Sequence, residues 1–266
     1  MTVGADWLIV FVKAPTPGEV KTRLLWSPTP PRRGGTLTPR PMWGDIPPTR
    51  SMRARGPLDI EDVKGPMAGS RLSGEEAAQL YRCLVLDTLG AARGVRGARL
   101  VVAYAANSRL PDLVWLGRRL PMFIQQGRGL GERLHHAVQH AFDRGARRVV
   151  VVGSDAPDLT TPWLRQAFRA LARYDVVLGP TQDGGYHLIG LNQPMPSLFV
   201  DMPWSTPLLF QRTIERIRRL QVTVHSLEPL ADLDTPKDLQ RYLTQPTFRH
   251  RRTSTAHYLR TLVHGQ

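Results

Sequence analysis

The sequence predicts an α/β protein built on a mainly parallel central sheet with helices on both faces. Short, uniformly apolar runs, of which Leu8–Val12 and Arg148–Gly153 are the clearest, have the character of strands that are buried on both faces. Segments with helical periodicity alternate with these runs, and that alternation is typical of parallel sheets. Ligands of such sheets bind beyond the carboxyl ends of the strands, so the candidate site lies in the loops at that edge.

Each further element is predicted from its own start signal or period. Ser73 and Glu76 have the S-x-x-E spacing of a capping box and open a helix whose apolar positions lie on one face. Thr161, Thr206 and Thr235 each precede a proline, which is a cap-plus-proline start of a helix. The remaining expected strands are Arg99–Tyr104, Met122–Gln125, Asp175–Leu178, Tyr186–Leu191 and Val222–Ser226, and the remaining expected helices are Pro111–Leu120, Leu130–Phe142 and Leu208–Leu220.

Two segments stand apart from this pattern. Residues 26–71 hold nine Pro and six Gly without a helical or strand period, so the sequence predicts a flexible insertion there. Residues 247–266 are basic and weakly patterned, and are expected to form a tail or a short helix on the surface. The chain is therefore expected to form a single domain over residues 1–246, interrupted by the insertion and followed by the basic segment.

The composition is that of a globular protein, with 41% hydrophobic and 22% charged residues in a chain of 266. No apolar run reaches the roughly 18–20 residues that span a bilayer, and the N-terminus lacks a secretory signal pattern, so a cytoplasmic location is expected. A single cysteine, Cys83, excludes an intramolecular disulfide and every metal site built from several cysteines.

The net charge of +14 points to anionic partners. Residues 26–71 and 247–266 together carry eight of these excess charges. The rest of the chain is moderately basic, which suits an enzyme for phosphorylated substrates at least as well as a nucleic-acid binder. Because neither a base-stacking module nor a helix-turn-helix pattern is evident, nucleic acid is not the expected partner.

The loop after the first strand carries the first candidate site. Its sequence, Lys13-Ala-Pro-Thr-Pro-Gly-Glu-Val-Lys-Thr-Arg-Leu24, brings Lys13, Lys21 and Arg23 together with Gly18. Point charges, a bidentate guanidinium and a close backbone approach are what a diphosphate group requires. The loop is therefore expected to bind phosphate rather than to be merely a solvated basic loop, although it lacks the G-x-x-x-x-G-K-[ST] pattern of a Walker loop.

Acidic residues supply the second candidate site. Asp155 follows a buried strand at its carboxyl end, where a carboxylate is costly unless it is paired or bound to metal, so Asp155 is expected to bind a divalent cation. Asp158 is also suited to capping the turn that follows. Asp232 and Asp234 precede a helix start far downstream, and one of them is expected to complete the metal site with phosphate oxygens and water.

Two further loops carry groups suited to a ligand. Gln182-Asp-Gly-Gly-Tyr186 puts a carboxylate and two glycines between two expected strands, a pattern that also fits an ordinary Asp-Gly hairpin turn. Met202-Pro-Trp-Ser-Thr206 is suited to stacking a ring or holding a phosphate, although capping alone explains Thr206. Gly127-Arg-Gly-Leu-Gly131 is not a dinucleotide fingerprint, because no strand–turn–helix unit with a ribose-binding acid follows it.

Taken together, the motifs occur in a characteristic order. They are Lys13-Ala-Pro-x-Pro-Gly-x-Val-Lys-Thr-Arg-Leu24, Leu72-Ser-x-Glu-Glu-Ala-Ala-x-Leu-Tyr81, Leu130-Gly-Glu-Arg133, Gly153-Ser-Asp-x-Pro-Asp-Leu159, Asp183-Gly-Gly-Tyr186, Pro203-Trp-Ser-Thr206 and Asp232-x-Asp-Thr-Pro-x-Asp-Leu239. In this order they resemble the radical-SAM/selenodomain-associated transferases, often described as arsenosugar-biosynthesis glycosyltransferases, over residues 8 to about 242. The one departure is the connection between Arg23 and Leu72, which is far longer than the few residues usual in that family.

That family is similar to GT-A nucleotide-diphospho-sugar transferases. The resemblance implies a Rossmann-like three-layer sandwich, a nucleotide above the first strand, and Mg²⁺ or Mn²⁺ on Asp155. Sugar-nucleotide cytidylyltransferases of the same superfamily carry a similar Asp-Thr-Pro-x-Asp-Leu segment whose first acid binds metal, which selects Asp234 over Asp232. The resemblance further implies nucleotide or phosphate contacts at Lys13, Pro15, Gly18, Lys21, Thr22, Arg23, Gly131 and Arg133, and substrate contacts at Asp158, Gly184, Gly185, Tyr186, Trp204, Ser205 and Thr206.

The expected activity is metal-dependent glycosyl transfer from a nucleotide sugar to a small-molecule acceptor. Asp155 and Asp183 are the expected catalytic residues, with Asp183 contacting the donor sugar or acting as base toward the acceptor. The alternative is nucleotidyl transfer from a nucleoside triphosphate to a small phosphorylated substrate with release of pyrophosphate, because the Lys-Thr-Arg-Leu stretch resembles phospholactate guanylyltransferases. A non-enzymatic alternative is a protein that binds nucleic acid or a partner enzyme through the insertion and the basic segment.

Overall fold

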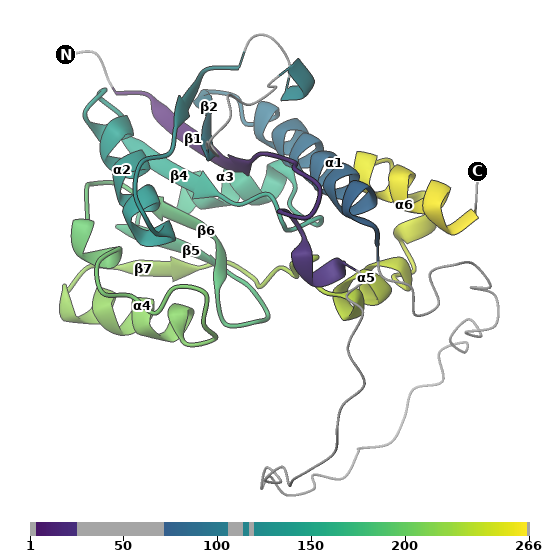
Figure 1. Cartoon of the computed structure of the whole chain (residues 1–266). Coiled ribbons are helices and arrows are strands. Elements are labelled where there is room, and N and C mark those ends of the chain that lie inside the picture. The colour runs from purple at the N-terminus through teal and green to yellow at the C-terminus, as the bar shows by residue number, and fades with distance from the viewer. Residues whose placement is uncertain (1–3, 26–71, 106–113, 117–119, 265–266) are drawn as a thin grey trace, which may run out of the picture.

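One seven-stranded sheet, flanked by helices, organises the chain (Figure 1). The computed structural model describes residues 4–25, 72–105, 114–116 and 120–264. The order of strands across the sheet is β3-β2-β1-β4-β6-β5-β7. The strands are β1 (Asp6–Lys13), β2 (Ala98–Ala105), β3 (Met122–Ile124), β4 (Arg148–Val152), β5 (Val176–Pro180), β6 (Tyr186–Leu191) and β7 (Val224–Ser226).

All strands except β6 run in the same direction, which confirms the expected α/β fold with a mainly parallel sheet. β6 pairs antiparallel with both β4 and β5. It follows β5 after the short turn over residues 181–185, and a connection this short joins antiparallel neighbours, whereas a parallel pair needs a long crossover. β1 lies inside the sheet between β2 and β4, so its carboxyl end opens at the middle of one edge.

Within the described residues there are six α-helices, five of them at expected positions. Ser73 and Glu76 form the expected capping box, with hydrogen bonds of 3.2 Å and 2.7 Å between side chain and backbone. The N-cap of α3 is Thr160, one residue earlier than expected. The expected helix Pro111–Leu120 falls largely outside the described residues, which there form a short 3-10 turn, Val114–Leu116. The helices are α1 (Gly74–Arg93), α2 (Leu130–Phe142), α3 (Thr161–Ala170), α4 (Leu209–Arg219), α5 (Pro236–Leu243) and α6 (Ser254–His264).

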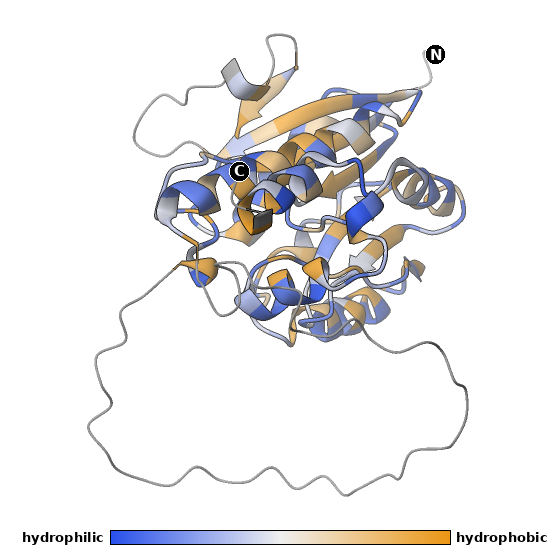
Figure 2. Ribbon diagram, turned by 90° about the vertical axis from the view of Figure 1, so that its right-hand side faces the viewer, coloured by the Kyte–Doolittle hydropathy of each residue, from blue (hydrophilic) through white to orange (hydrophobic). Residues whose placement is uncertain are grey.

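Helices cover both faces of the sheet and complete three layers. Alternate residues of β1 show this, because Leu8 and Val10 are buried in one core with α1 and α3, whereas Trp7 and Ile9 are buried in another with α2 and α4. Figure 2 shows the strands mostly in the apolar colour and the helices with mixed apolar and polar positions. None of the described helices combines the length and the apolar character that crossing a membrane would require.

The C-terminal segment adds a third, smaller core on the outer face of α1. Phe248 and Leu259 are buried there together with Leu84 of α1. Asp87 of α1 accepts hydrogen bonds from the N–H groups at the start of α6, including that of Ser254 at 2.7 Å. Of the two forms expected for residues 247–266, a tail or a short surface helix, the described part therefore takes the helical one and is packed into the fold (Figure 1).

The expected flexible insertion, residues 26–71, lies outside the described residues. The residues that flank it meet each other: Leu25 and Leu72 form an isolated bridge, and the Leu72 N–H donates to the Leu24 carbonyl at 2.9 Å. Leu24 and Leu72 are both buried in the third core. The two described segments that flank residues 26–71 therefore lie side by side, and the loop after β1 stays next to α1.

Candidate active site

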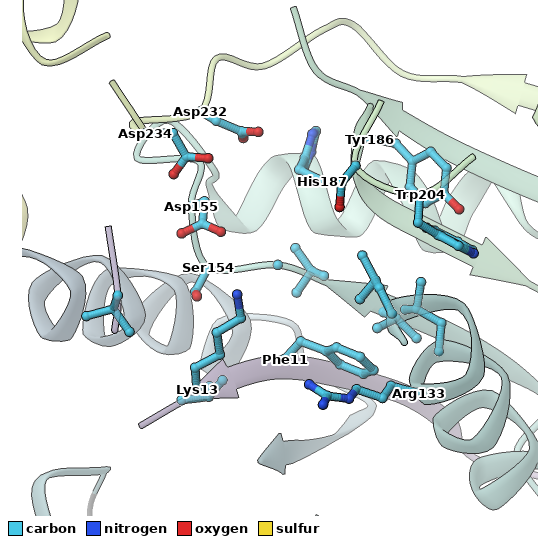
Figure 3. A pocket seen from close by; sticks show the side chains of 18 of the residues that line it. Phe11, Lys13, Arg133, Ser154, Asp155, Tyr186, His187, Trp204, Asp232 and Asp234 are labelled. Carbon is cyan, nitrogen blue, oxygen red and sulfur yellow. The ribbon is translucent and has the colours of Figure 1, made fainter. Parts of the chain in front are cut away.

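A cavity of about 550 Å³ opens at the edge of the sheet where β1 and β4 end. Its walls come from the loops after these two strands, the start of β6, the first turns of α2, the loop at Trp204 and the segment before α5. This is the edge at which α/β sheets bind ligands. Figure 3 shows that the cavity has two distinct ends, with carboxylates at one and aromatic rings at the other.

Lys21, Asp155 and Asp234 meet at the acidic end. The Lys21 ammonium donates to Asp155 Oδ1 and, at 2.7 Å, to Asp234 Oδ1. The Lys21 side chain is 3% exposed, whereas the side chains of Asp155 and Asp234 are 43% and 37% exposed. Three segments far apart in the sequence thus form one ion-pair cluster, in which the ammonium is covered and the carboxylates remain accessible.

The backbone around the cluster fixes its members. Lys21 lies in the left-handed region, with φ 51°, directly before the short turn Thr22–Leu24, and this conformation costs a residue with a side chain roughly 1–2 kcal/mol. The Leu233 N–H donates to the Asp155 carbonyl at 2.9 Å, which ties the segment before α5 to the loop after β4. Thr235 then caps α5 in a capping box with Asp238. Each carboxylate is therefore carried by a loop anchored on both sides.

The ion pairs determine the protonation states of Lys21 and Asp155. Burial on its own would lower the pKa of Lys21, but Asp155 and Asp234 outweigh burial and raise that pKa above its ordinary value. Burial on its own would raise the pKa of Asp155, but Lys21, with a smaller effect of Lys13, lowers it. Lys21 is accordingly cationic and Asp155 anionic at neutral pH.

Asp232 lies beside the cluster without joining its hydrogen bonds. Its Oδ1 atom is buried and has no hydrogen-bond partner within the described part of the chain. Burial, reinforced by Asp155, Asp234 and Asp183, raises the pKa of Asp232 to about 8. Of the two downstream acids that the sequence pattern left open, Asp234 is therefore the one bonded to Lys21, and Asp232 is mostly protonated at neutral pH.

The donor set at this end suits a hard divalent cation. Mg²⁺ is usually held by one or two carboxylates together with substrate phosphates, and Asp155 and Asp234 are two carboxylates that already share one cationic partner. Across residues 4–25, 72–105, 114–116 and 120–264, His, Cys, Asp and Glu side chains do not gather in threes to form a metal site. An ion bound here would therefore complete its coordination with oxygens of water or of a bound phosphate.

Basic groups and a buried tyrosine line the cavity beside the cluster. Lys13 is the last residue of β1, Arg23 follows in the segment after this strand, and Arg133 lies in α2. The Tyr81 hydroxyl accepts the Lys13 N–H at 2.8 Å and the Ser154 hydroxyl at 3.3 Å, and so connects the end of β1 to the loop after β4. Cationic side chains around a carboxylate pair are suited to a polyphosphate that binds together with a metal ion.

Tyr186 and Trp204 form the aromatic end of the cavity. Their rings meet edge to face with centroids 6.1 Å apart, and Trp204 Nε1 donates to the Phe199 carbonyl at 3.3 Å. A Cβ atom on Gly131 would come within 2.3 Å of Trp204 Nε1. Gly131, expected to contact nucleotide, instead makes room for Trp204. An aromatic ring in the cavity wall is suited to packing against a nucleobase or another ring.

Ten of the eighteen residues predicted for the site line the cavity and eight do not. Those in the lining are Lys13, Lys21, Thr22, Arg23, Arg133, Asp155, Tyr186, Trp204, Ser205 and Asp234. Those outside it are Pro15, Gly18, Gly131, Asp158, Asp183, Gly184, Gly185 and Thr206.

Asp183 and its two glycine neighbours serve the turn between β5 and β6. Asp183 Oδ1 accepts the Gly185 N–H at 3.1 Å and the Thr181 hydroxyl. Gly184 has φ 88°, and a Cβ atom there would come within 2.1 Å of the Pro207 carbonyl oxygen. The hairpin interpretation therefore accounts for these residues, and the geometry gives no support for Asp183 as a catalytic base or for the two glycines as substrate contacts.

Asp158, expected at the substrate, forms an ion pair with Arg251 instead. The Arg251 guanidinium also donates to Gln245 Oε1 at 2.6 Å and lies 5.0 Å from the centroid of the Tyr242 ring. Asp158 thus fastens the loop after β4 to the C-terminal segment. Because this segment was expected to be peripheral, the sequence offered no partner for Asp158.

The remaining three residues outside the lining have local roles. Pro15 is buried in the loop after β1. Gly18 has φ 81°, a conformation that glycine adopts without strain. The Thr206 hydroxyl donates to the Pro203 carbonyl at 2.8 Å, within the turn that leads into α4.

Sequence reasoning did not single out Tyr81, Ser154 and His187 as lining residues. Tyr81 and Ser154 lie inside motifs that had been recognised, but Tyr81 has the helical spacing of a core residue. His187 is a titratable residue within the apolar strand β6, and this break in the apolar pattern is the sequence feature that marks it. Its side chain is buried, with Nδ1 3.3 Å from the Pro180 carbonyl oxygen, and burial lowers its pKa to about 4.

The chain is similar to a described protein family, to a guanylyltransferase and to a solved structure. Residues 88–206 match the family described as an uncharacterized protein conserved in bacteria, DUF2064. The 2-phospho-L-lactate guanylyltransferase of Halobacterium salinarum (strain ATCC 29341 / DSM 671 / R1) is 28% identical over 201 residues, which are 75% of this chain and 88% of the relative. A solved structure from Desulfovibrio desulfuricans G20, provisionally described as a nucleotide-diphospho-sugar transferase, is 33% identical, has a TM-score of 0.73 and covers 98% of both chains.

Of the broad and the narrow resemblance expected from the sequence, these relatives support only the broad one. The broader resemblance, to nucleotide-diphospho-sugar transferases, is confirmed by the Desulfovibrio protein, which matches the fold and the sequence over nearly all of both chains. The narrower link to radical-SAM/selenodomain-associated or arsenosugar transferases is not shown by these relatives. The chain therefore belongs to the same family as the Desulfovibrio protein, and its central part carries the DUF2064 match.

Proposed function

We propose that the chain is a metal-dependent nucleotidyltransferase, which transfers a nucleoside monophosphate group from a nucleoside triphosphate to the phosphate of a small acceptor. Transferase is the class that both named relatives share, and the family relationship extends it to this chain. Nucleotidyl transfer is the more specific reaction that we propose within this class. The Halobacterium relative is a guanylyltransferase for a phosphorylated hydroxy acid, so small phosphorylated acids are the acceptors to test first.

One observation carries the proposal: an ion-pair cluster with accessible carboxylates shares a cavity with further cationic side chains. Asp155 and Asp234 lie on one side of this space, and Lys13, Arg23 and Arg133 line the rest. A triphosphate carries several negative charges close to the reacting phosphorus. Positioned cations that neutralise charge as it develops are the largest single contribution a site of this kind makes to rate.

In the proposed reaction an oxygen of the acceptor phosphate attacks the α-phosphorus of the nucleotide. The bond between that phosphorus and the oxygen bridging to the β-phosphate breaks, and pyrophosphate leaves with the electron pair. Lys13, Lys21 and Arg23 stabilise the charge on the leaving group. Bound by Asp155, Asp234 and phosphate oxygens, Mg²⁺ or Mn²⁺ would supply further charge neutralisation.

Glycosyl transfer, the activity expected first from the sequence, has less support. A hydroxyl acceptor loses a proton in the reaction and benefits from a general base. Asp183, assigned to that role, is engaged in a turn and does not line the cavity. A phosphate acceptor is already ionised near neutral pH, because its second pKa is about 6, and it needs no base. The arrangement of carboxylates therefore favours the nucleotidyl alternative.

Two parallel incubations test this choice. The protein is supplied with each nucleoside triphosphate, Mg²⁺ or Mn²⁺, and a panel of phosphorylated hydroxy acids, and separately with nucleotide sugars and the same acids. We expect pyrophosphate release that requires the acceptor, and a nucleotidyl-acceptor product of matching mass. Nucleoside diphosphate release from a nucleotide sugar, with no pyrophosphate from any triphosphate, would contradict the proposal and restore glycosyl transfer.

A binding experiment tests the proposed metal ligands without catalysis. We expect Asp155→Asn to lose the thermal stabilisation that nucleotide and Mn²⁺ together give the wild-type protein, because bound ligand stabilises in proportion to RT ln(1 + [L]/Kd). Asp183→Asn is the matched control and should keep this stabilisation, since residue 183 lies outside the lining. Equal stabilisation of Asp155→Asn and wild type would exclude Asp155 as a ligand.

A further inference from the structure

Lys21 occupies the position between two carboxylates that the proposed function gives to a divalent cation. Its ammonium is bonded to both Asp155 and Asp234. Only 3% of the Lys21 side chain is exposed, so in this arrangement its charge is committed to the two acids rather than directed at a ligand in the cavity. The same lysine belongs to the loop expected to bind phosphate, and these two roles require two positions of the ammonium.

The ammonium and a divalent ion would oppose each other at this pair of carboxylates. Lys21 Nζ contacts Oδ1 of both Asp155 and Asp234, so an ion held by the same two acids would place a +2 charge within a few ångströms of a +1 charge. Repulsion at this separation is several times stronger in a partly buried site than in water, because the effective dielectric constant is lower. Metal ion and ammonium are therefore competitors for one pair of ligands.

The cavity also offers the Lys21 ammonium a second position, beside the phosphates of a bound nucleotide. Lys13, at the end of β1, and Arg23 are close to Lys21 in the sequence, and all three residues line the cavity in which phosphates would bind. A lysine ammonium sits on a flexible four-carbon stem and can reorient without movement of the backbone. Figure 3 shows Lys13 reaching toward the space between Ser154 and the aromatic end, so a displaced Lys21 would join a cationic group that faces the cavity.

We propose that Lys21 is the resident counter-ion of the Asp155–Asp234 pair, and that metal ion and ammonium exchange places when the nucleotide binds. This inference rests on the proposed function and describes how its metal site is regulated. Without nucleotide, the ammonium keeps the carboxylates together and the metal affinity low. With nucleotide, the ammonium moves to the phosphates and leaves both carboxylates to the metal, so nucleotide and metal strengthen each other's binding by the same factor.

Mn²⁺ binding in the absence of nucleotide tests the exchange directly. The dissociation constant is measured by electron paramagnetic resonance of free Mn²⁺, or by calorimetry, for the wild type and for Lys21→Met. This substitution keeps an unbranched side chain only one atom shorter and removes its charge. We expect Lys21→Met to bind Mn²⁺ at least about tenfold more tightly than the wild type does. Lys13→Met, in which the substituted lysine is not bonded to either carboxylate, is the matched control and should change the affinity much less.

The coupling between ligands gives a second readout. Mn²⁺ should raise the affinity for a non-hydrolysable nucleoside triphosphate analogue by a larger factor in the wild type than in Lys21→Met, because the variant has no ammonium to exchange. Unchanged or weaker Mn²⁺ binding by Lys21→Met overturns the proposal. Lys21→Gln, which keeps a hydrogen-bond donor for the carboxylates, serves for the same comparison if Lys21→Met does not fold.

Asp155→Asn separates this proposal from the function on which it rests. If Asp155→Asn loses Mn²⁺ binding while Lys21→Met gains none, the metal site stands and only the exchange is wrong. If Asp155→Asn binds Mn²⁺ like the wild type, the proposed metal site itself is wrong. Circular dichroism and thermal unfolding of each variant show that the compared proteins are folded.

Discussion

Burial of His187 in β6 makes the fold sensitive to mild acid. The residue is 6% exposed, and burial lowers the pKa of its imidazole from 6.5 to about 4, although its hydrogen bond with the Pro180 carbonyl acts in the opposite direction. In the unfolded chain the imidazole takes up a proton near pH 6.5. As the pH falls below 6.5 the unfolded state therefore gains protons that the folded state does not bind, and the free energy of unfolding decreases until about pH 4.

The size of the effect follows from the two pKa values. The full gap between 6.5 and about 4 corresponds to roughly 3 kcal/mol, reached only at or below pH 4. Between pH 7.5 and pH 5.0 the linkage relation gives a loss of about 2 kcal/mol from this one group. That is a large part of the roughly 5–15 kcal/mol by which a domain is stable.

A paired comparison isolates this contribution. His187→Asn keeps an amide donor near the Pro180 carbonyl and removes the titration. Urea unfolding at pH 7.5 and pH 5.0 gives the stability change of each protein, and subtracting one change from the other cancels the titration of all groups that the two share. We expect the wild type to lose about 2 kcal/mol more than the variant. Equal losses would show that the folded protein accepts a proton on residue 187 without cost, and would refute the reasoning.

Two further predictions concern residues that the sequence assigned to the substrate. Gly184→Ala should destabilise the protein by roughly 2–4 kcal/mol in urea unfolding, since its φ is positive and the new methyl group would overlap the Pro207 carbonyl oxygen; Gly90→Ala, in a helix with open space at that position, is the control and should stabilise by about 0.5–1 kcal/mol. Arg251→Met should cost about 1–3 kcal/mol, because it leaves the partly buried carboxylate of Asp158 without its partner; a cost below about 0.5 kcal/mol would mean that this ion pair does not hold the C-terminal segment.

The parts of the fold that sequence predicts well are those decided by neighbours along the chain. The capping box at Ser73 and the start of α5 at Thr235 satisfy helix N–H groups within four residues, so their signals are complete in the local sequence. The apolar runs of β1 and β4 likewise report burial on both faces directly. Such features depend on no distant partner, and a single sequence contains all the information they need.

The parts that sequence predicts poorly are those decided by distant partners. The helical patterning of residues 254–264 is weak by itself, and α6 is stabilised by the outer face of α1 and by hydrogen bonds to Asp87. The carboxylate of Asp158 forms an ion pair with Arg251, 93 positions away in the sequence. Motif similarity marks both Asp155 and Asp183 as acids of the site, and the Asp-Gly pattern also allows a turn at Asp183. The three-dimensional arrangement separates them, because Asp155 lines the cavity and Asp183 bonds within the turn.

This separation of the two acids also supports the proposed choice between the two chemistries that the motifs leave open. Glycosyl and nucleotidyl transfer need nearly the same cations around a diphosphate, so the basic loop after β1 cannot distinguish them. They differ in the acceptor, because a hydroxyl group must give up a proton whereas a phosphate does not. The candidate for that proton, Asp183, is engaged by Thr181 and Gly185 in a turn outside the cavity. The geometry therefore favours an acceptor that arrives already ionised, and with it the nucleotidyl reaction.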